Sequence, residues 1–204
     1  HKVVMVFQYP EHQLFEETIA ADIAFGPKNL GLDEEEVDRR VREAMDFVGL
    51  DYDTYAERSP FHLSGGQMRR VAIAGVVAME PDFLVLDEPS AGLDPFGREE
   101  IFEEIIKLHN EKKITVILVS HNMEDISRMA NRLIVLDKGK IVLDGKQLDI
   151  FNHQRHVLQE VGVDVPPVSV LIESLRNRGL DISNKVLSVD DAVKSILAGG
   201  HNVK

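Results

Sequence analysis

The sequence contains no cysteine among its 204 residues. This absence excludes a disulfide framework, a zinc–thiolate site and a cysteine nucleophile, and it fits a protein of a reducing compartment. Long apolar runs are missing as well. The longest, such as residues 83–86 and 114–119, are far shorter than the roughly 20 residues that cross a bilayer as a helix.

Lysine and arginine are scarce relative to aspartate and glutamate. The sequence has 23 basic and 35 acidic residues, which gives a formal net charge of -12 at pH 7. The acidic surplus lies in residues 1–150, because residues 151–204 carry equal numbers of the two signs. A surface of this charge disfavours sequence-independent binding to DNA and to anionic lipid headgroups. We therefore expect no nucleic-acid partner.

Three short runs of apolar and β-branched residues are typical of strands. They cover residues 2–7, 83–86 and 114–120. Continuous apolar runs of this length indicate strands that are covered on both faces, as in a parallel sheet. A further pair of short strands is expected to form a hairpin around Lys138-Gly139.

Helical patterns separate these strands. Asp33 can cap a helix that ends at Gly49, with Glu36 at the third position of its first turn. Further helices are expected over residues 68–79 and 98–113 because of their apolar periodicity and terminal charges. The alternation of strands and helices predicts an α/β fold with a mostly parallel sheet.

The pattern changes after Gly162. Pro166-Pro167 is typical of a helix start and Gly179 of a helix end, while Ser188 is expected to cap a second helix. We expect residues 150–204 to form a small C-terminal helical extension, separate from a domain of residues 1–149.

Two carboxylates, Asp87 and Glu88, directly follow the second apolar run. In open α/β sheets ligands bind at the carboxyl ends of the strands, so these acids are expected beside a ligand. One can hold Mg²⁺ on nucleotide phosphates, and the next can orient and polarise an attacking water. Taken alone, the pair fits a solvated acidic turn equally well.

The string Leu63-Ser64-Gly65-Gly66-Gln67 places a hydroxyl and two glycine amides just ahead of a predicted helix. Free N–H groups and the positive end of a helix dipole form an anion site at such a place. The alternative is an ordinary Ser-Gly-Gly loop. At average composition, however, this string arises by chance in roughly one of thousands of such chains. It therefore predicts phosphate binding.

Three other features carry little weight singly. Gln8 ends the first strand, His121 follows the third, and Ser90-Ala91-Gly92-Leu93-Asp94 by itself resembles an ordinary turn. A lone histidine is more often structural than catalytic. The order of all these features along the chain is far more informative than any one of them.

This order resembles that of the ABC ATPase family along residues 1–145. By this resemblance, Glu88 is the catalytic glutamate and Asp87 is the Walker B aspartate that holds Mg²⁺. Gln8 is the Q-loop residue, which serves both catalysis and the metal, and His121 is the switch histidine of catalysis.

The resemblance also assigns ATP contacts to two further motifs. These are the D-loop aspartate Asp94 and the family's signature, called the signature segment below and made of Ser64, Gly65, Gly66 and Gln67. In the family, the signature of one ATPase completes the ATP site of a second across a head-to-tail dimer. The implied fold is P-loop NTPase-like, with a helical (signature) subdomain inserted at about residues 14–80.

Residues 7–15, 25–27 and 63–75 narrow the resemblance to the ATPase subunits of energy-coupling-factor (ECF) and cobalt-type importers. These importers pair two ATPases, identical or different, with a membrane coupling protein and a substrate-capturing membrane protein for vitamins or metal ions. The resemblance implies an ATP-hydrolysing subunit, peripheral at the cytoplasmic face of the cell membrane, whose C-terminal extension promotes dimerisation.

One motif of the family is missing from these residues. The loop G-x-x-x-x-G-K-[ST], which cradles nucleotide phosphates, occurs nowhere in the sequence, and we expect it to precede His1 in the complete protein. Without it, the chain alone is expected neither to bind ATP at micromolar concentration nor to hydrolyse it. An ATPase-inactive regulatory chain is therefore one alternative.

The second alternative is a non-transport ABC ATPase that acts on DNA. Such proteins typically insert long coiled coils between the Q-loop and the signature. The stretch from residue 9 to residue 62 leaves no room for one, and the acidic composition disfavours DNA.

Overall fold

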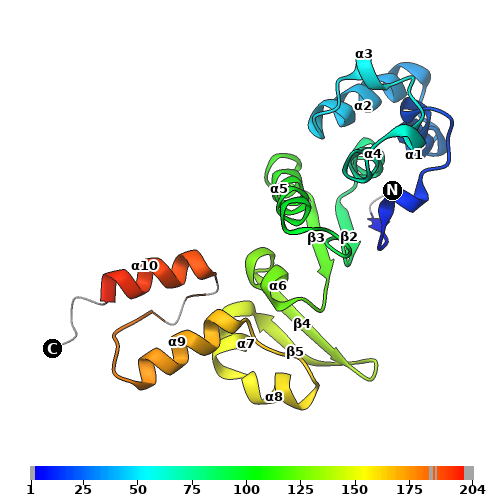
Figure 1. The fold of residues 1–204 in the computed structure, drawn as a ribbon. Coiled ribbons are helices and arrows are strands. Elements are labelled where there is room, and N and C mark those ends of the chain that lie inside the picture. Colours follow the sequence, from blue (N-terminus) through cyan, green and yellow to red (C-terminus); the bar gives the residue numbers. More distant parts are fainter. Residues whose placement is uncertain (1–2, 184–185, 187, 200–204) are drawn as a thin grey trace. The chain divides into compact units, whose positions relative to one another are not determined.

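The computed structural model describes residues 3–183, 186 and 188–199 and divides the chain into two compact units. Figure 1 shows the elements of both. Unit 1 (His1–Val119) contains β1 (Val3–Val6), η1 (Pro10–Gln13), α1 (Ile19–Asn29), α2 (Glu34–Phe47), α3 (Tyr52–Tyr55), η2 (Pro60–His62), α4 (Gly65–Ala78), β2 (Phe83–Asp87), α5 (Pro95–Lys112) and β3 (Thr115–Val119). Unit 2 (Ser120–Lys204) contains α6 (Met123–Met129), β4 (Arg132–Asp137), β5 (Lys140–Lys146), α7 (Gln147–His153), α8 (Arg155–Glu160), α9 (Pro167–Asn177) and α10 (Val189–Gly199).

The three strands of unit 1 form a parallel sheet in the order β1-β2-β3. Val6 of β1 lies opposite Leu86 of β2, which in turn lies opposite Leu118 of β3. This register brings the carboxyl ends of all three strands to one edge of the sheet. The predicted α/β fold with a parallel sheet is confirmed.

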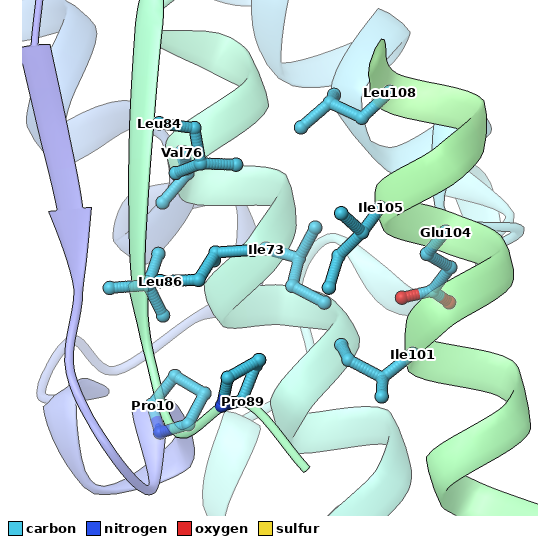
Figure 2. A pocket seen from close by; sticks show the side chains of 11 residues that line it. Pro10, Ile73, Val76, Leu84, Leu86, Pro89, Ile101, Glu104, Ile105 and Leu108 are labelled. Atoms are coloured by element: carbon cyan, nitrogen blue, oxygen red, sulfur yellow. The ribbon is translucent and has the colours of Figure 1, made fainter. Parts of the chain in front are cut away.

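Side chains alternate in exposure along these strands. Leu84 and Leu86 of β2 are buried toward α4 and α5, as Figure 2 shows, whereas Phe83 is 40% exposed. Val3 and Ile117 of the neighbouring strands are exposed as well. The expectation of strands covered on both faces was wrong for the described residues. Strand side chains point alternately to the two faces, and the helices of unit 1 cover only one of them.

Helices α1, α2 and α4 pack against one another in the stretch between β1 and β2. Helix α2 begins as predicted, because the Asp33 side chain accepts a hydrogen bond from the backbone N–H of Glu36 at 2.9 Å. It ends before Gly49, whose φ of 70° suits glycine. Its apolar face buries Val41 and Met45. These helices occupy the stretch for which an inserted helical subdomain is predicted.

Two helices begin three residues earlier than the sequence predicts. Helix α4 starts at Gly65 and helix α5 at Pro95. In both, the preceding polar side chain (Ser64 or Asp94) accepts a hydrogen bond from a first-turn N–H and so caps the helix. Proline is compatible with the first position of a helix, where no hydrogen-bond donor is needed.

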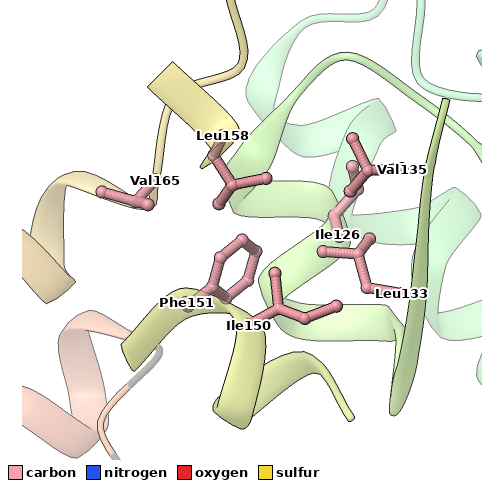
Figure 3. Packing of buried hydrophobic residues seen from close by; sticks show 7 residues of the cluster. All are labelled: Ile126, Leu133, Val135, Ile150, Phe151, Leu158 and Val165. Carbon is pink, nitrogen blue, oxygen red and sulfur yellow. The ribbon is translucent and has the colours of Figure 1, made fainter. Parts of the chain in front are cut away.

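Unit 2 begins with α6 and the antiparallel hairpin of β4 and β5. Lys138 and Gly139 have φ values of 48° and 75°, which are typical of a two-residue hairpin turn, as predicted. An apolar cluster, shown in Figure 3, packs the hairpin against the helices around it: Ile126, Leu133, Val135, Ile150, Phe151, Leu158 and Val165. Residues on both sides of residue 150 therefore share one core. The boundary between a domain of residues 1–149 and an extension of residues 150–204 stays a prediction.

The last two helices follow the predicted pattern. Gly179 after α9 has a φ of 92°, and Ser188 Oγ accepts a hydrogen bond from the N–H of Asp191 at 3.1 Å. The two helices share a second, small apolar cluster: Ile172, Ile182, Val186 and Ala192. Helices α6, α7 and α8 were not predicted, because six or seven residues are too few for a clear helical period.

Candidate functional site

Two predicted site segments lie at the carboxyl edge of the sheet in unit 1. Gln8 follows β1 by two residues, Asp87 ends β2, and Glu88 comes next. Since β1 and β2 are adjacent and parallel, these three residues lie at the same edge of the sheet. Gln8 is exposed and both acids are half-buried, so a ligand from solvent can reach them.

The backbone of Glu88 adopts a conformation that is rare outside glycine. Its φ is 48°, in the left-handed region that costs an L-residue roughly 1–2 kcal/mol. Its N–H donates to the carbonyl of Val119 on β3 at 2.9 Å, and its own carbonyl accepts from the N–H of Ala91 at 3.0 Å. These bonds hold the chain as it leaves β2. Strained residues of this kind concentrate at functional sites.

Tyr9 connects the Gln8 segment with the turn that precedes Asp94. Tyr9 has a φ of 59°, and its ring stacks on His12 with the ring centroids 5.6 Å apart. A Cβ added at Gly92, whose φ is 72°, would lie only 3.0 Å from Cε1 of Tyr9. Glycine at position 92 therefore allows both the turn and this close contact. Nothing in the sequence pairs these two residues, so the contact was not predicted.

The signature segment forms the first turn of α4 and not a loop before it. Ser64 Oγ accepts a hydrogen bond from the N–H of Gln67 at 3.3 Å, and Gln67 Oε1 accepts one from the N–H of Ser64 at 3.1 Å. This reciprocal pair is a capping box, which explains the early helix start. Gln67 Nε2 also donates to the hydroxyl of Tyr55 at 3.4 Å. Both polar side chains of the segment therefore help to begin the helix.

Gly65 and Gly66 occupy the first two positions of α4, and both are exposed. Neither has a positive φ, and no described atom lies within 4 Å of where a Cβ would be. Glycine in a helix costs roughly 0.5–1 kcal/mol relative to alanine, and the packing of this chain gives no reason for it. Two amides without side chains, open to solvent, suit the close approach of a ligand from outside the chain.

Asp94 lies at the start of α5 and is exposed. Its Oδ1 accepts a hydrogen bond from the N–H of Gly97 at 2.7 Å, so this carboxylate caps the helix. The capping bond to Gly97 therefore fixes the position of Asp94, the residue for which an ATP contact is predicted.

His121 belongs to unit 2 and follows the end of β3 by two residues, as predicted. Its side chain is exposed. The next residue, Asn122, caps α6 by accepting hydrogen bonds from the N–H groups of Glu124 and Asp125 at 3.0 and 3.3 Å. His121 is thus held between a strand end and a capped helix start.

Two absences hold for the part of the chain that the structure describes. No group of three or more histidine, aspartate or glutamate side chains gathers there as a possible metal site. No helix among the same residues is long and apolar enough to cross a membrane.

Comparison with known proteins decides the family. Residues 1–91, which hold Gln8, Asp87, Glu88 and the signature segment, match the family model described as ABC transporter. The energy-coupling factor transporter ATP-binding proteins EcfA2 of Clostridium tetani and Clostridium perfringens are 57% and 55% identical over 196 residues. These alignments span 96% of this chain and 68% of each relative. The chain belongs to the ABC transporter ATP-binding family.

Solved structures place this ABC ATPase chain among the same proteins. CbiO1 of Clostridium perfringens, described as part of the ABC transporter complex CbiONQ, is 35% identical, with a TM-score of 0.67 over 84% of this chain and 67% of its own. The ATP-binding cassette MJ0796, a dimer bound to ADP and Pi, is 29% identical, with a TM-score of 0.57 over 71% of this chain and 62% of its own. The predicted resemblance to ECF and cobalt-type ATPases is confirmed.

Proposed function

We propose that this ABC ATPase chain is part of the ATP-hydrolysing subunit of an ECF-type importer of vitamins or transition-metal ions. The observation that carries the proposal is the position of Gln8, Asp87 and Glu88 at the same carboxyl edge of the sheet. Relatives named as ECF ATP-binding proteins, at 50–57% identity over most of the chain, support the importer class.

Asp87 and Gln8 fit the protein share of a magnesium site. Mg²⁺ in ATPases takes one or two carboxylates and completes its shell with waters and substrate phosphates. When bound, Mg²⁺ neutralises charge that develops on the phosphate oxygens. Asp87 and Gln8 are suited to hold it, because Asp87 ends β2 and Gln8 follows the end of the adjacent parallel strand β1 by two residues.

Glu88 is proposed to orient and polarise the water that attacks the γ-phosphate. Its carboxylate is half-buried and belongs to a backbone that the bond to Val119 holds in place. A positioned base of this kind contributes roughly 10²–10⁴-fold to a rate. By the resemblance to the family, His121 is assigned a catalytic contact to the γ-phosphate.

The signature segment is proposed to contact the ATP of a second ATPase subunit, together with Asp94. The open amides of Gly65 and Gly66 support a partner that approaches from outside the chain. The dimeric state of the solved cassette MJ0796 supports a second ATPase as that partner. Identical and different subunits are both compatible with this arrangement.

The exposed side of α10 supports a dimerisation role for residues 150–204. Val189, Val193 and Leu197 follow one another at four-residue spacing and are 70%, 50% and 69% exposed. This spacing places all three on one side of the helix. We assign this stripe to the second ATPase subunit. A membrane coupling protein and a substrate-capturing membrane protein complete the proposed assembly, with the ATPases peripheral at the cytoplasmic face of the membrane.

The central test of the proposed function is Glu88→Gln in the complete protein, with the upstream residues in place. Magnesium-dependent ATP binding should persist, while turnover should fall by roughly 10²–10⁴-fold. Glu111→Gln, an exposed acid on α5, is the matched control and should hydrolyse ATP as the unaltered protein does. Unchanged turnover in Glu88→Gln contradicts the role of this carboxylate. The 204-residue chain alone, which lacks the G-x-x-x-x-G-K-[ST] loop, should bind no ATP at micromolar concentration.

A further inference from the structure

A buried ion pair joins the segment after Gln8 to the helix that begins with the signature segment. Arg69 lies in the second turn of α4 and is only 5% exposed. Its Nη2 lies 3.2 Å from Oε2 and 3.4 Å from Oε1 of Glu11, and its Nε lies 3.3 Å from Oε2. Glu11 is in η1, three residues after Gln8. One guanidinium therefore contacts both oxygens of a carboxylate that lies 58 residues earlier in the sequence.

The segment of residues 9–16, called the arm below, is held at both of its ends. At one end, the N–H of His12 donates to the carbonyl of Tyr9 at 3.0 Å, and the two rings stack. At the other end, Asp22 Oδ2 on α1 accepts from the N–H groups of Phe15 and Glu16 at 2.8 and 2.9 Å. Between these contacts, Glu11 forms the ion pair that links the arm to Arg69 of α4.

This ion pair is poorly suited to stabilise the fold. Removing two charges from water is costly, and attraction offsets the cost only when every donor of the guanidinium finds an acceptor. Arg69 Nη1 is buried and has no hydrogen-bond partner among the described residues. A matched apolar pair at positions 11 and 69 should therefore fold as well as the charged one. The pair is better explained by a positioning role. Contact of the Arg69 guanidinium with both oxygens of Glu11 fixes the orientation of the two side chains as well as the distance between them.

We propose that Glu11 and Arg69 are positioning residues, which hold the arm in a fixed register on α4. Gln8 directly precedes the arm and Ser64 caps α4, so the pair sets where Gln8 lies relative to the signature segment. This inference rests on the proposed function for its consequence in ATP hydrolysis. Its structural part, the register of the arm, stands without any nucleotide.

The experiment compares three proteins with the unaltered one. The double variant Glu11→Met with Arg69→Met removes both charges and keeps apolar volume. The single variant Arg69→Met leaves Glu11 without its partner. Arg70→Met is the matched control, because Arg70 is the next residue of α4 but pairs with Glu100 and Glu104 on α5. Amide hydrogen exchange is measured across the arm of the full chain, together with the melting temperature.

The double variant should keep its melting temperature, while the N–H of His12 exchanges about tenfold faster. The N–H groups of Phe15 and Glu16 should change little, because Asp22 holds them independently. Arg70→Met should leave all three rates unchanged. Unchanged exchange of His12 in the double variant overturns the proposal. A lower melting temperature with faster exchange throughout unit 1 also overturns it, since a purely structural pair would give that result.

Turnover in the complete protein then tests the consequence for catalysis. The double variant should lower kcat by roughly tenfold to hundredfold and leave the KM for ATP little changed, because displaced catalytic groups slow the chemical step. If the unaltered protein hydrolyses no ATP, the proposed function fails, while the exchange measurement still decides the register of the arm. Normal kcat in a variant with a mobile arm would overturn the positioning role.

Discussion

Glu104 on α5 places a carboxylate among apolar side chains. It borders a cavity of about 20 Å³ that is otherwise lined by apolar residues of β1, β2, α4 and α5 and by two prolines, as Figure 2 shows. Burial raises the pKa of Glu104 from 4.5 to about 7, although the Arg70 guanidinium, with its Nε 3.4 Å from Oε1, partly opposes the rise. Glu104 therefore binds a proton more tightly in the folded chain than in the unfolded one.

The sign of the effect on stability follows from this raised pKa. Protonated Glu104 contributes stability that is complete below about pH 4.5 and is lost as the pH rises through about 7. At about 1.4 kcal/mol for each pH unit between these two values, the ceiling is about 3 kcal/mol. Because the side chain keeps some contact with water, we expect about 1–2 kcal/mol.

The assay is urea unfolding of the unaltered chain, of Glu104→Gln and of Glu103→Gln, at about pH 5.5 and about pH 8.5. Glu103 is the exposed neighbour on the same helix and serves as the control. Between the two pH values, the free energy of unfolding should fall by about 1 kcal/mol more in the unaltered chain and in Glu103→Gln than in Glu104→Gln, because part of the effect is already lost below pH 5.5. Parallel pH dependence in all three would refute the reasoning.

Three further predictions concern the proposed function. Gly66→Ala should raise the free energy of unfolding by roughly 0.5–1 kcal/mol, because the φ of Gly66 is negative and no described atom lies where the added Cβ would be. The same variant should lower ATP turnover in the assembled transporter, and a loss of stability would contradict the prediction. His121→Ala should lower turnover without changing the far-ultraviolet circular dichroism, and a stoichiometric zinc ion on His121 in purified protein would contradict its assignment to phosphate. Leu197→Asp on α10 should weaken dimerisation in analytical ultracentrifugation, whereas Lys194→Asp, a surface change on the same helix, should not. If Leu197→Asp and the unaltered protein have equal association constants, the α10 stripe contacts another partner.

Local sequence signals predicted those elements in which neighbouring residues decide the structure. Helix α2 followed from Asp33 and Glu36, because a cap and its partner lie three residues apart. The same signal is present at Ser64 and Gln67, but the two intervening glycines disfavour a helix by propensity, and the sequence predicts this helix only from residue 68. The capping box outweighs that propensity, so α4 begins at the signature segment.

Contacts between distant residues could not be predicted from this one sequence. Tyr9 meets Gly92, and Glu11 meets Arg69, only because the sheet and α4 bring them together. Similarly, an apolar strand such as β3 shows no alternation, so its sequence cannot tell which face is covered. The candidate site residues were nevertheless found at strand ends and helix starts, because parallel strands of one sheet end at the same edge.

Helix α4 is tied on two sides by consecutive arginines. Arg69 pairs with Glu11 of η1, and Arg70 pairs with Glu100 and Glu104 of α5. Successive residues point about 100° apart around a helix, so the two attachments hold α4 from different directions. Rotation of α4 about its own axis would break at least one of them. Any movement that starts at Ser64 is therefore expected to be a displacement of the whole helix, transmitted to η1 and α5 together.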